Sequence, residues 1–414
     1  MLDGVNVALG VTGSIAAVKT VELAHELRRH GAAVRAVTTD SAEGILHPWA
    51  LEFATERPVV REITGAVEHV ELCGRDGWAD VLLIAPATAN TVGKIAGAVD
   101  DTPVTTCATT ALGAGVETVV VPAMHEPMYD HPGVLDALDR LESWGVRFVD
   151  PRIEEGKAKI AAASAVVTEV ARAAGDRPLS GRHVVVTAGA TSEAVDPVRV
   201  LTSRASGKTG RAVARACRAA GAEVTLVHDG DDVPWADCRR VESAAEMLAA
   251  VRDAVGGDAG DGNDTGESSD AGDGNDTGES EPAADALVSA AAISDYTVAA
   301  ADQKIRSGRE SLTLELEPTP KLIDEVAADH PELTVVGFKA ETEGDDDAMV
   351  ARARETMRRA GLAFVVANDA SVMGDDETRA LVVREPGAAE PVAEFTGTKA
   401  RLGTRVAAEL AREL

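Results

Sequence analysis

The sequence has few aromatic residues, few cysteines and no long apolar run, and each shortage excludes something. Phe, Trp and Tyr make up only 3% of the 414 residues, so the hydrophobic cores must be built from Val, Ala, Leu and Ile. The four cysteines lack the paired spacing of metal or redox motifs, and Cys107 and Cys217 stand in apolar surroundings typical of buried free thiols. The first apolar run, residues 5–9, follows no basic region and is too short for a signal peptide or a membrane span. We therefore expect a soluble protein of the cytoplasm.

Basic residues are also in the minority. There are 40 Lys and Arg residues against 69 Asp and Glu residues, and the net charge is −29. A field of this sign repels nucleic acids and anionic membranes, which argues against partners of either kind. It is typical of a protein that stays soluble in concentrated salt, where charges are screened within about 3 Å at 1 M. We interpret the charge as the mark of a halophilic cytoplasm and not as a clue to the reaction.

One structural plan occurs twice along the chain. A strand, a glycine loop, a helix and a second strand are indicated over residues 5–37 and again over 184–227, with a turn-forming linker at 175–178. Further short apolar runs in both halves are typical of strands buried on both faces: 81–84, 118–121, 286–291, 335–338 and 364–369. The sequence predicts two three-layer α/β domains, flavodoxin-like or Rossmann-like, with mainly parallel sheets. Their expected bounds are 1–177 and 178–414.

Three segments stand apart from this plan. The sequence DAGDGNDTGES occurs at 258–268 and again at 270–280. It has no apolar residue beyond Ala, and a calcium loop from Asp261 would meet Gly272 where a Glu is needed, so 256–282 is predicted to be an acidic disordered insertion. The alternation of Leu312, Leu314 and Leu316 predicts a half-buried strand. The polar segment 153–159 is interpreted as a mobile flap.

The residues after the strand at 81–84 mark a candidate site. Segment 85–91, Ala-Pro-Ala-Thr-Ala-Asn-Thr, leads into a helical stretch, so small residues and free N–H groups would face a ligand at the carboxyl end of a strand. His69 could act on that ligand, although a surface histidine near an ordinary strand–helix joint would look the same. The glycine loop at 10–14 lacks the dinucleotide pattern G-x-G-x-x-G, and hydroxyl residues close the second strand where an acid would be expected. This favours a mononucleotide such as FMN over NAD.

Taken together, the motifs of both halves resemble the bifunctional phosphopantothenoylcysteine decarboxylase/phosphopantothenate–cysteine ligases of coenzyme A synthesis. The resemblance covers nearly the whole chain apart from the acidic insertion. It rests on these segments in this order: 13–16, His69, 78–80, 85–91, 122–124, 187–191, 196–199, 206–208, 295–296, 304–305 and 336–338.

The resemblance implies that residues 1–177 form an FMN-dependent decarboxylase acting on 4′-phosphopantothenoylcysteine. His69 would be its proton shuttle, a role that suits a side chain with a pKa near neutrality. The residues implied to contact FMN are Gly13, Ser14, Ile15, Thr38, Thr39, Ser41, Thr88, Ala89, Asn90, Thr91 and Ala123.

The resemblance implies that residues 178–414 form the ligase. It would activate 4′-phosphopantothenate as an acyl-cytidylate and then let the amino group of L-cysteine attack. The implied co-substrate is CTP, with ATP possible, and the implied metal is Mg²⁺ with unknown ligands. Lys304 would stabilise charge on the nucleotide phosphate. The residues implied to bind the nucleotide are Ser289, Ala290, Ala291, Asp295, Lys304, Pro320, Lys321 and Phe338.

Several positions depart from the family pattern. His125 stands where the family has an asparagine that contacts the substrate carboxylate, and Ser203 stands where the ligase loop has an asparagine. The cysteine-bearing flap is replaced by 154–159. Two lysines expected near the nucleotide have no match, which leaves Arg354, Arg358 and Arg359 as possible substitutes.

Two alternatives stay open beside the bifunctional enzyme. One is a decarboxylase whose ligase half has become a structural domain, and the other is a flavin-carrying protein that regulates a partner. The resemblance also suggests trimeric flavin domains joined through dimeric ligase domains, which together would build a homo-oligomer as large as a dodecamer.

Overall fold

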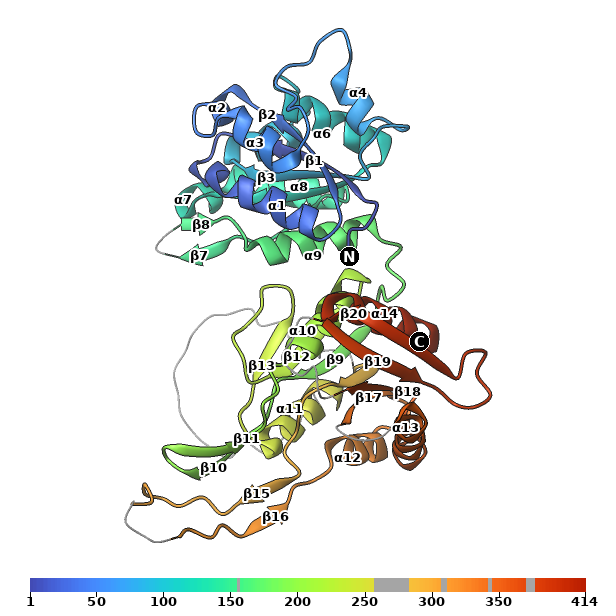
Figure 1. Ribbon diagram of the computed structural model, residues 1–414. Coiled ribbons are helices and arrows are strands. Elements are labelled where there is room, and N and C mark those ends of the chain that lie inside the picture. The colour runs from blue at the N-terminus through green and yellow to red at the C-terminus, as the bar shows by residue number, and fades with distance from the viewer. Residues whose placement is uncertain (155–156, 257–282, 307–310, 342–344, 370–376) are drawn as a thin grey trace. The chain divides into compact units, whose positions relative to one another are not determined.

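The computed structural model describes the whole chain except residues 155–156, 257–282, 307–310, 342–344 and 370–376 (Figure 1). It divides into two compact units, Met1–Arg177 and Pro178–Leu414. The predicted acidic insertion therefore lies, apart from Gly256, outside the described residues. In the described part of the chain, no helix is both long and apolar enough to cross a membrane.

The first unit is organised around a five-stranded parallel sheet. Its strands, in spatial order, are β2 (Ala33–Thr38), β1 (Asn6–Val11), β3 (Val81–Ala87), β4 (Glu117–Pro122) and β6 (Arg147–Phe148). Every residue of β3 is buried, which confirms that the apolar run at 81–84 belongs to a strand covered on both faces. The strand continues to Ala87, so the first half of the predicted site segment is itself part of the sheet.

Helices cover both faces of this sheet. One apolar cluster joins the sheet to α4 (Glu68–Cys73), α5 (Ala89–Ala96), α6 (Pro103–Ala114) and α8 (Pro132–Ser143). On the other face α1 (Thr20–Arg29) and α9 (Ala163–Ala174) pack against each other. The remaining elements are short: η1 (Ile15–Lys19), α2 (Asp40–Glu43), α3 (Pro48–Thr55), β5 (Met124–His125), α7 (Glu126–Tyr129), β7 (Arg152–Glu154) and β8 (Lys157–Lys159).

The second unit is organised around an eight-stranded sheet. Its strands, in spatial order, are β13 (Asp237–Arg240), β12 (Glu223–His228), β9 (His183–Ala188), β14 (Ala286–Ser289), β17 (Thr334–Glu341), β18 (Phe364–Asp369), β19 (Glu377–Val383) and β20 (Val392–Thr398). The first six run parallel to one another; β19 pairs antiparallel with β18, and β20 pairs antiparallel with β19. The predicted class, three-layer α/β with mainly parallel sheets, is confirmed in both units.

The layers of the second unit also follow the apolar pattern. Helices α10 (Lys208–Ala219) and α14 (Lys399–Glu413) share one apolar cluster, and α11 (Ala244–Gly256), α12 (Leu322–Asp329) and α13 (Asp346–Ala360) share the other. Two small ribbons complete the unit: β10 (Ser192–Asp196) with β11 (Arg199–Thr202), and β15 (Tyr296–Val298) with β16 (Leu316–Pro318).

The prediction of a half-buried strand through Leu312, Leu314 and Leu316 is wrong. Only Leu316 lies in a strand, and the three side chains are 46%, 39% and 43% exposed. The reason is that β16 pairs only with β15 in a two-stranded ribbon, so the alternating leucines have no apolar layer in their own chain to pack against.

Two other expectations have a definite outcome. The segment interpreted as a flap forms the antiparallel strands β7 and β8, and β8 also pairs with β5; residues 155–156 lie outside the described residues. Cys107 and Cys217 are buried free thiols as predicted, as is Cys73, whereas Cys238 is partly exposed.

A buried ion cluster anchors the last helix to the sheet. The side chain of Glu409 is 2% exposed, and its carboxylate pairs with Arg384 from the end of β19, with Arg405 at 2.7 Å and with Arg412 at 2.8 Å. Burial by itself raises the pKa of Glu409, but the three guanidinium groups outweigh it and hold that pKa below its usual value.

We expect Glu409→Gln to lower the free energy of unfolding by about 3 kcal/mol, because three arginines would then lack their anion. A lowered carboxyl pKa contributes stability above the pKa of the unfolded chain, about 4.3, and that stability is lost as the pH falls through the folded pKa. Urea unfolding from about pH 7 to pH 3 should therefore show a shallower loss for the variant than for the wild type. Glu413→Gln, at an exposed position of the same helix, is the matched control. Equal unfolding curves for both variants would contradict the assignment.

Candidate active sites

A cavity of about 610 Å³ lies at the carboxyl ends of β1, β3 and β4. Gly13 and Ser14 reach it from the loop after β1, Thr88 from the end of β3, and Ala123 from the end of β4. Because β2 lies on one side of β1 and β3 on the other, the order of strands reverses between β1 and β3. Open parallel sheets bind ligands in the crevice at such a point.

Hydroxyl groups tie the loops of this edge together. Ser14 Oγ accepts from the N–H of Ala16 at 3.4 Å and donates to the carbonyl of Ala123 at 3.2 Å. Thr88 Oγ1 accepts from the N–H of Thr91 at 3.2 Å and so caps α5. The first turns of η1 and α5 therefore both begin at the cavity, where their N–H groups favour an anion.

The residues predicted to contact FMN take four different positions. Those that line the cavity are Gly13, Ser14, Ile15, Thr88 and Ala123. Ser41 lies directly behind Gly13, because a Cβ at Gly13 would be 2.4 Å from Ser41 Oγ, and Thr39 Oγ1 is 3.0 Å from the same atom. Thr38 is buried at the end of β2 and its hydroxyl is 3.0 Å from Glu43. Residues 89–91 form the first turn of α5 behind Thr88.

The two histidines singled out by sequence are separated. His125, which follows β4, lines the cavity. His69 lies in α4 and does not line it, and its buried Nδ1 atom has no hydrogen-bond partner among the described residues. Sequence analysis missed three cations that line the cavity, Lys19, Arg152 and Lys159. The last two belong to the β7–β8 hairpin, the segment that had been interpreted only as a flap.

The second unit has a cavity of about 580 Å³ at the carboxyl ends of β9, β14, β17 and β18. The strand order again reverses here, between β9 and β14. The start of α10 packs tightly on the end of β9, because a Cβ at Gly210 would lie 2.6 Å from Ala188 Cβ and one at Gly207, where φ is +67°, would lie 2.8 Å from the Gly189 nitrogen. Only glycine fits these two positions, and the close packing brings the first turn of α10 to the cavity.

Lysines gather at both cavities although the chain has only nine of them. Four line the second cavity, namely Lys208, Lys321, Lys339 and Lys399, and Lys19 and Lys159 line the first. In a chain whose net charge is −29, this placement indicates that both cavities take anionic ligands.

Three arginines were possible substitutes for the two lysines without a match, and one of them reaches the second cavity. Arg354 and Arg358 do not line the second cavity, and Arg359 does so while paired with Asp324. The cations that the sequence analysis overlooked are Lys339 and Lys399. Lys339 follows the predicted residue Phe338 directly in β17, and the scarcity of lysine elsewhere was the signal that could have identified it.

Most residues predicted to bind a nucleotide line the second cavity. They are Ala290, Ala291, Asp295, Lys321 and Phe338. Asp295 and Lys321 form an ion pair. Ser289 is buried in β14 and Pro320 precedes Lys321, but neither lines the cavity.

Lys304 and Ser203 also lie away from this cavity. The segment that carries Lys304 is held by the β10–β11 ribbon: the N–H of Ile305 donates to Asp196 at 3.0 Å, and Arg199 donates to the Ile305 carbonyl at 3.1 Å. Burial by itself raises the pKa of Asp196, but the N–H groups that point at its carboxylate and the Arg199 guanidinium outweigh it, so the pKa lies below its usual value.

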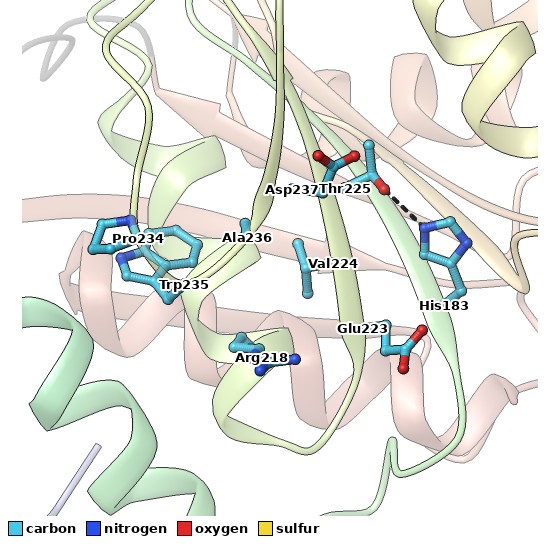
Figure 2. A pocket seen from close by; sticks show the side chains of 9 residues that line it. All are labelled: His183, Arg218, Glu223, Val224, Thr225, Pro234, Trp235, Ala236 and Asp237. Atoms are coloured by element: carbon cyan, nitrogen blue, oxygen red, sulfur yellow. Dashed lines mark hydrogen bonds between the residues drawn. The ribbon is translucent and has the colours of Figure 1, made fainter. Parts of the chain in front are cut away.

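A third hollow, of about 370 Å³, lies at the opposite edge of the same sheet. Figure 2 shows its lining residues, which come from the amino ends of β9, β12 and β13, from α10 and from the connection before β13. Trp235 lies beside Pro234, and His183 Nε2 is 2.9 Å from Thr225 Oγ1. None of the residues predicted from sequence lines it. Ligands of open parallel sheets bind at the carboxyl edge, so we do not take this hollow as an active site.

We expect Lys339→Met to weaken binding of a nucleoside triphosphate about tenfold or more, since a hydrogen bond to a charged group contributes about 1.5–3 kcal/mol. Titration calorimetry of the full chain with CTP and with ATP, at one fixed salt concentration, measures the effect. Lys94→Met is the control, because the Lys94 ammonium is paired with Asp101 at 2.7 Å in the other unit. An unchanged affinity in Lys339→Met would show that this lysine does not face the phosphates.

Comparison with known proteins gives results for both units. Residues 1–175 match the sequence model of a family described as Flavoprotein, and residues 179–259 and 275–414 match that of the DNA/pantothenate metabolism flavoprotein C-terminal domain. The second match omits residues 260–274, which lie within the predicted acidic insertion.

Individual relatives cover most of the chain. It is 45% identical over 386 residues to the coenzyme A biosynthesis bifunctional protein CoaBC of Thermococcus kodakarensis, a match that covers 92% of this chain and 89% of that protein. The protein of the same name from Methanocaldococcus jannaschii is 32% identical, with 98% and 93% covered. Among solved structures, the FMN-dependent cysteine decarboxylase SpaF is 31% identical, with 42% of this chain and 100% of that chain covered at a TM-score of 0.38.

Proposed function

Because this chain belongs to the CoaBC family of coenzyme A biosynthesis bifunctional proteins, we propose that each of its two units catalyses one step of that pathway. The second unit joins L-cysteine to 4′-phosphopantothenate, and the first removes carbon dioxide from the 4′-phosphopantothenoylcysteine that results. The observation that carries the proposal is the pair of cavities at the carboxyl edges of two separate sheets, which together hold six of the nine lysines. Both proposed substrates carry a phosphate, which such lysines bind.

The residues of the first cavity fit FMN. The loops after β1 and β2 meet where Gly13 leaves no room for a Cβ, the first turns of η1 and α5 offer N–H groups, and the Flavoprotein family model matches this unit. When bound there, FMN would supply the oxidation and the reduction of the cysteine moiety that precede and follow the loss of carbon dioxide.

The chain's own residues would bind and orient the substrate. Lys19, Arg152 and Lys159 place positive charge at the cavity for the phosphate or the carboxylate of the substrate, and His125 stands where it can donate a hydrogen bond to that carboxylate. Met124 and Met128 add apolar surface to the wall of the cavity. The decarboxylation then takes place beside cations that orient the substrate but do not themselves react.

His69 fits the role of proton shuttle only if a second copy of the chain completes the site. In one chain it does not line the cavity, yet large apolar side chains on the same unit are exposed: Ile15 to 77%, Phe53 to 76% and Trp49 to 75%. Ile15 itself lines the cavity. Exposed apolar groups of this size mark an interface, so we propose that flavin units assemble as a trimer and that ligase units dimerise through the exposed leucines at 312, 314 and 316.

The second unit would carry out acyl activation and amide formation. The substrate carboxylate attacks the α-phosphate of CTP and pyrophosphate leaves; the amino group of cysteine then attacks the acyl carbon and CMP leaves. Lys208, Lys339 and Lys399 offset the phosphate charge, and Asp295 is the one carboxylate among the described lining residues, which makes it the proposed Mg²⁺ ligand. Lys304 belongs to a segment that the bond from the Ile305 N–H to Asp196 holds away from the cavity. This segment would have to approach the cavity before Lys304 could act.

One observation favours the alternative of a decarboxylase with a structural ligase unit. Lys304 and Ser203, which the family resemblance places in the ligase reaction, both lie outside the cavity. The four lysines at that cavity argue against this alternative, because a purely structural unit in so acidic a chain has no use for them. The two functions are separated by the following experiment.

We expect the full chain to release pyrophosphate when supplied with 4′-phosphopantothenate, cysteine, Mg²⁺ and CTP, and Lys304→Gln to lower that rate about a hundredfold, which corresponds to about 3 kcal/mol. Decarboxylation by the same variant should be unchanged, because the flavin site lies in the other unit. An absence of pyrophosphate from the wild type with either CTP or ATP would leave the structural alternative in place.

We expect His69→Asn to keep the visible absorption of bound FMN and to lose the release of carbon dioxide from 4′-phosphopantothenoylcysteine. His131→Asn is the matched control: His131 accepts from the Gly133 N–H at 3.1 Å as the cap of α8, and asparagine can make the same cap. Decarboxylation at the wild-type rate in His69→Asn would exclude His69 as the proton shuttle.

A further inference from the structure

A buried histidine in the second unit has neither ring nitrogen in use. His228 ends β12, is 0% exposed, and among the described residues both its Nδ1 and its Nε2 lack a hydrogen-bond partner. A buried polar group without a partner is costly and rare in native proteins. Neither of the proposed reactions uses His228, so this side chain needs another explanation.

Two further metal-ligating groups lie next to this ring. The ligand atoms of His228, Asp232 and Cys238 all lie within 4.8 Å of one another. Strand geometry brings two of them together, because Cys238 of β13 pairs in register with Leu226 of β12, and His228 is two residues further along β12 on the same face. Figure 1 shows the two strands side by side at the edge of the sheet.

We propose that His228, Asp232 and Cys238 bind a divalent transition-metal ion, and that Zn²⁺ fits them best. An imidazole, a thiolate and a carboxylate are ligands that Zn²⁺ accepts, whereas Mg²⁺ prefers oxygen ligands only. Three protein ligands leave the fourth tetrahedral position to water. Neighbouring ligands of Zn²⁺ lie roughly 3.3–3.8 Å apart at its usual bond lengths. The ligand atoms here lie within 4.8 Å of one another, and the exposed side chain of Asp232 can rotate to shorten its distances to the other two.

The surroundings of the three groups suit a cation. The N–H of Val233 lies 3.3 Å from Cys238 Sγ, the kind of outer contact that supports a metal-bound sulfur. Asp231 and Asp232 lie near Arg240, at 3.7 and 3.6 Å, so one carboxylate can turn to the metal while the other keeps the arginine. The connection 228–232, His-Asp-Gly-Asp-Asp, carries three aspartates, against the two arginines, Arg211 and Arg240, whose charges act on His228.

The metal would act as a clip between two parallel strands. Only residues 229–236 connect β12 to β13, whereas a connection between parallel strands generally needs a dozen residues or more. Ligands at both ends of this short connection would hold it closed. Asp229 lies within this connection and packs closely on Gly189, since a Cβ added at Gly189 would lie 1.8 Å from Asp229 Oδ1. Gly189 in turn lines the second cavity. The clip would therefore fix one wall of that cavity.

Titration of the chelator-treated full chain with Co²⁺ alone tests the site by spectroscopy. We expect one equivalent of Co²⁺ to give a near-ultraviolet band from sulfur-to-metal charge transfer, which Zn²⁺ abolishes by displacement and Mg²⁺ does not. Cys238→Ala should lack the band, and Cys217→Ala, which removes a buried thiol from α10 of the same unit, should keep it. No band in the wild type, or the same band in Cys238→Ala, would overturn the proposal.

The neighbouring residue Asp231 is a matched control for the carboxylate ligand Asp232, because it is exposed and also faces Arg240. Asp232→Asn should weaken Co²⁺ binding at least about tenfold, whereas Asp231→Asn should leave it unchanged. Both positions are exposed, so neither variant threatens the fold. Equal affinities in the two variants would remove Asp232 from the site.

Alkylation provides a readout that does not depend on a spectrum. Cys73, Cys107 and Cys217 are buried, so iodoacetamide should modify Cys238 first in the folded chain. Zn²⁺ at ten times its dissociation constant should slow that modification roughly tenfold, as followed by peptide mass spectrometry, and Mg²⁺ should not. Unchanged labelling in the presence of Zn²⁺ would count against metal binding at Cys238.

Discussion

In both units the strands that border the cavities run parallel, so that their carboxyl ends open on the same edge of the sheet. This constraint places loops that are far apart in sequence beside one another: those after β1, β3 and β4 in the first unit, and those after β9, β14 and β17 in the second. Each cavity lies where the strand order reverses, because there the connections leave the sheet in opposite directions and a crevice remains. The glycines at 13, 207 and 210 let those loops approach each other without side-chain obstruction.

Charge is the second constraint, and it acts against the expected ligands. A chain with a net charge of −29 repels phosphates at a distance, although concentrated salt would screen that repulsion to within a few ångströms. Contacts inside a cavity are shorter than this screening distance, so a local group of lysines can still bind an anion. The gathering of six of the nine lysines at two cavities is therefore the arrangement that anionic substrates need in such a protein.

The residues that lie outside the cavities are informative as well. His69 and the exposed side chains of Ile15, Trp49 and Phe53 belong to one unit, which fits a site that a second copy completes. Lys304 is tied through Ile305 to Asp196, so the ligase reaction would need that segment to move. The proposed metal clip at His228, Asp232 and Cys238 adjoins Asp229, which packs on Gly189 in the wall of the second cavity, and would keep that wall in place.

The sequence by itself determined the class of fold and most of the residues at the cavity edges. Apolar runs such as 81–84 require burial on both faces, and only a parallel sheet covered by helices provides it; the small and hydroxyl residues that follow each run then fall at one edge. It could not determine which side chains meet across that edge. Lys339 and Lys399 come from β17 and from the start of α14, and Cys238 reaches His228 only through the register of β12 and β13. Nor could alternation alone tell that Leu312 and Leu314 lie outside a strand, because a period of two specifies a face but not whether anything packs on it. The distances between segments that are far apart in sequence depend on the packing of the whole unit, so only the tertiary structure decided which side chains meet.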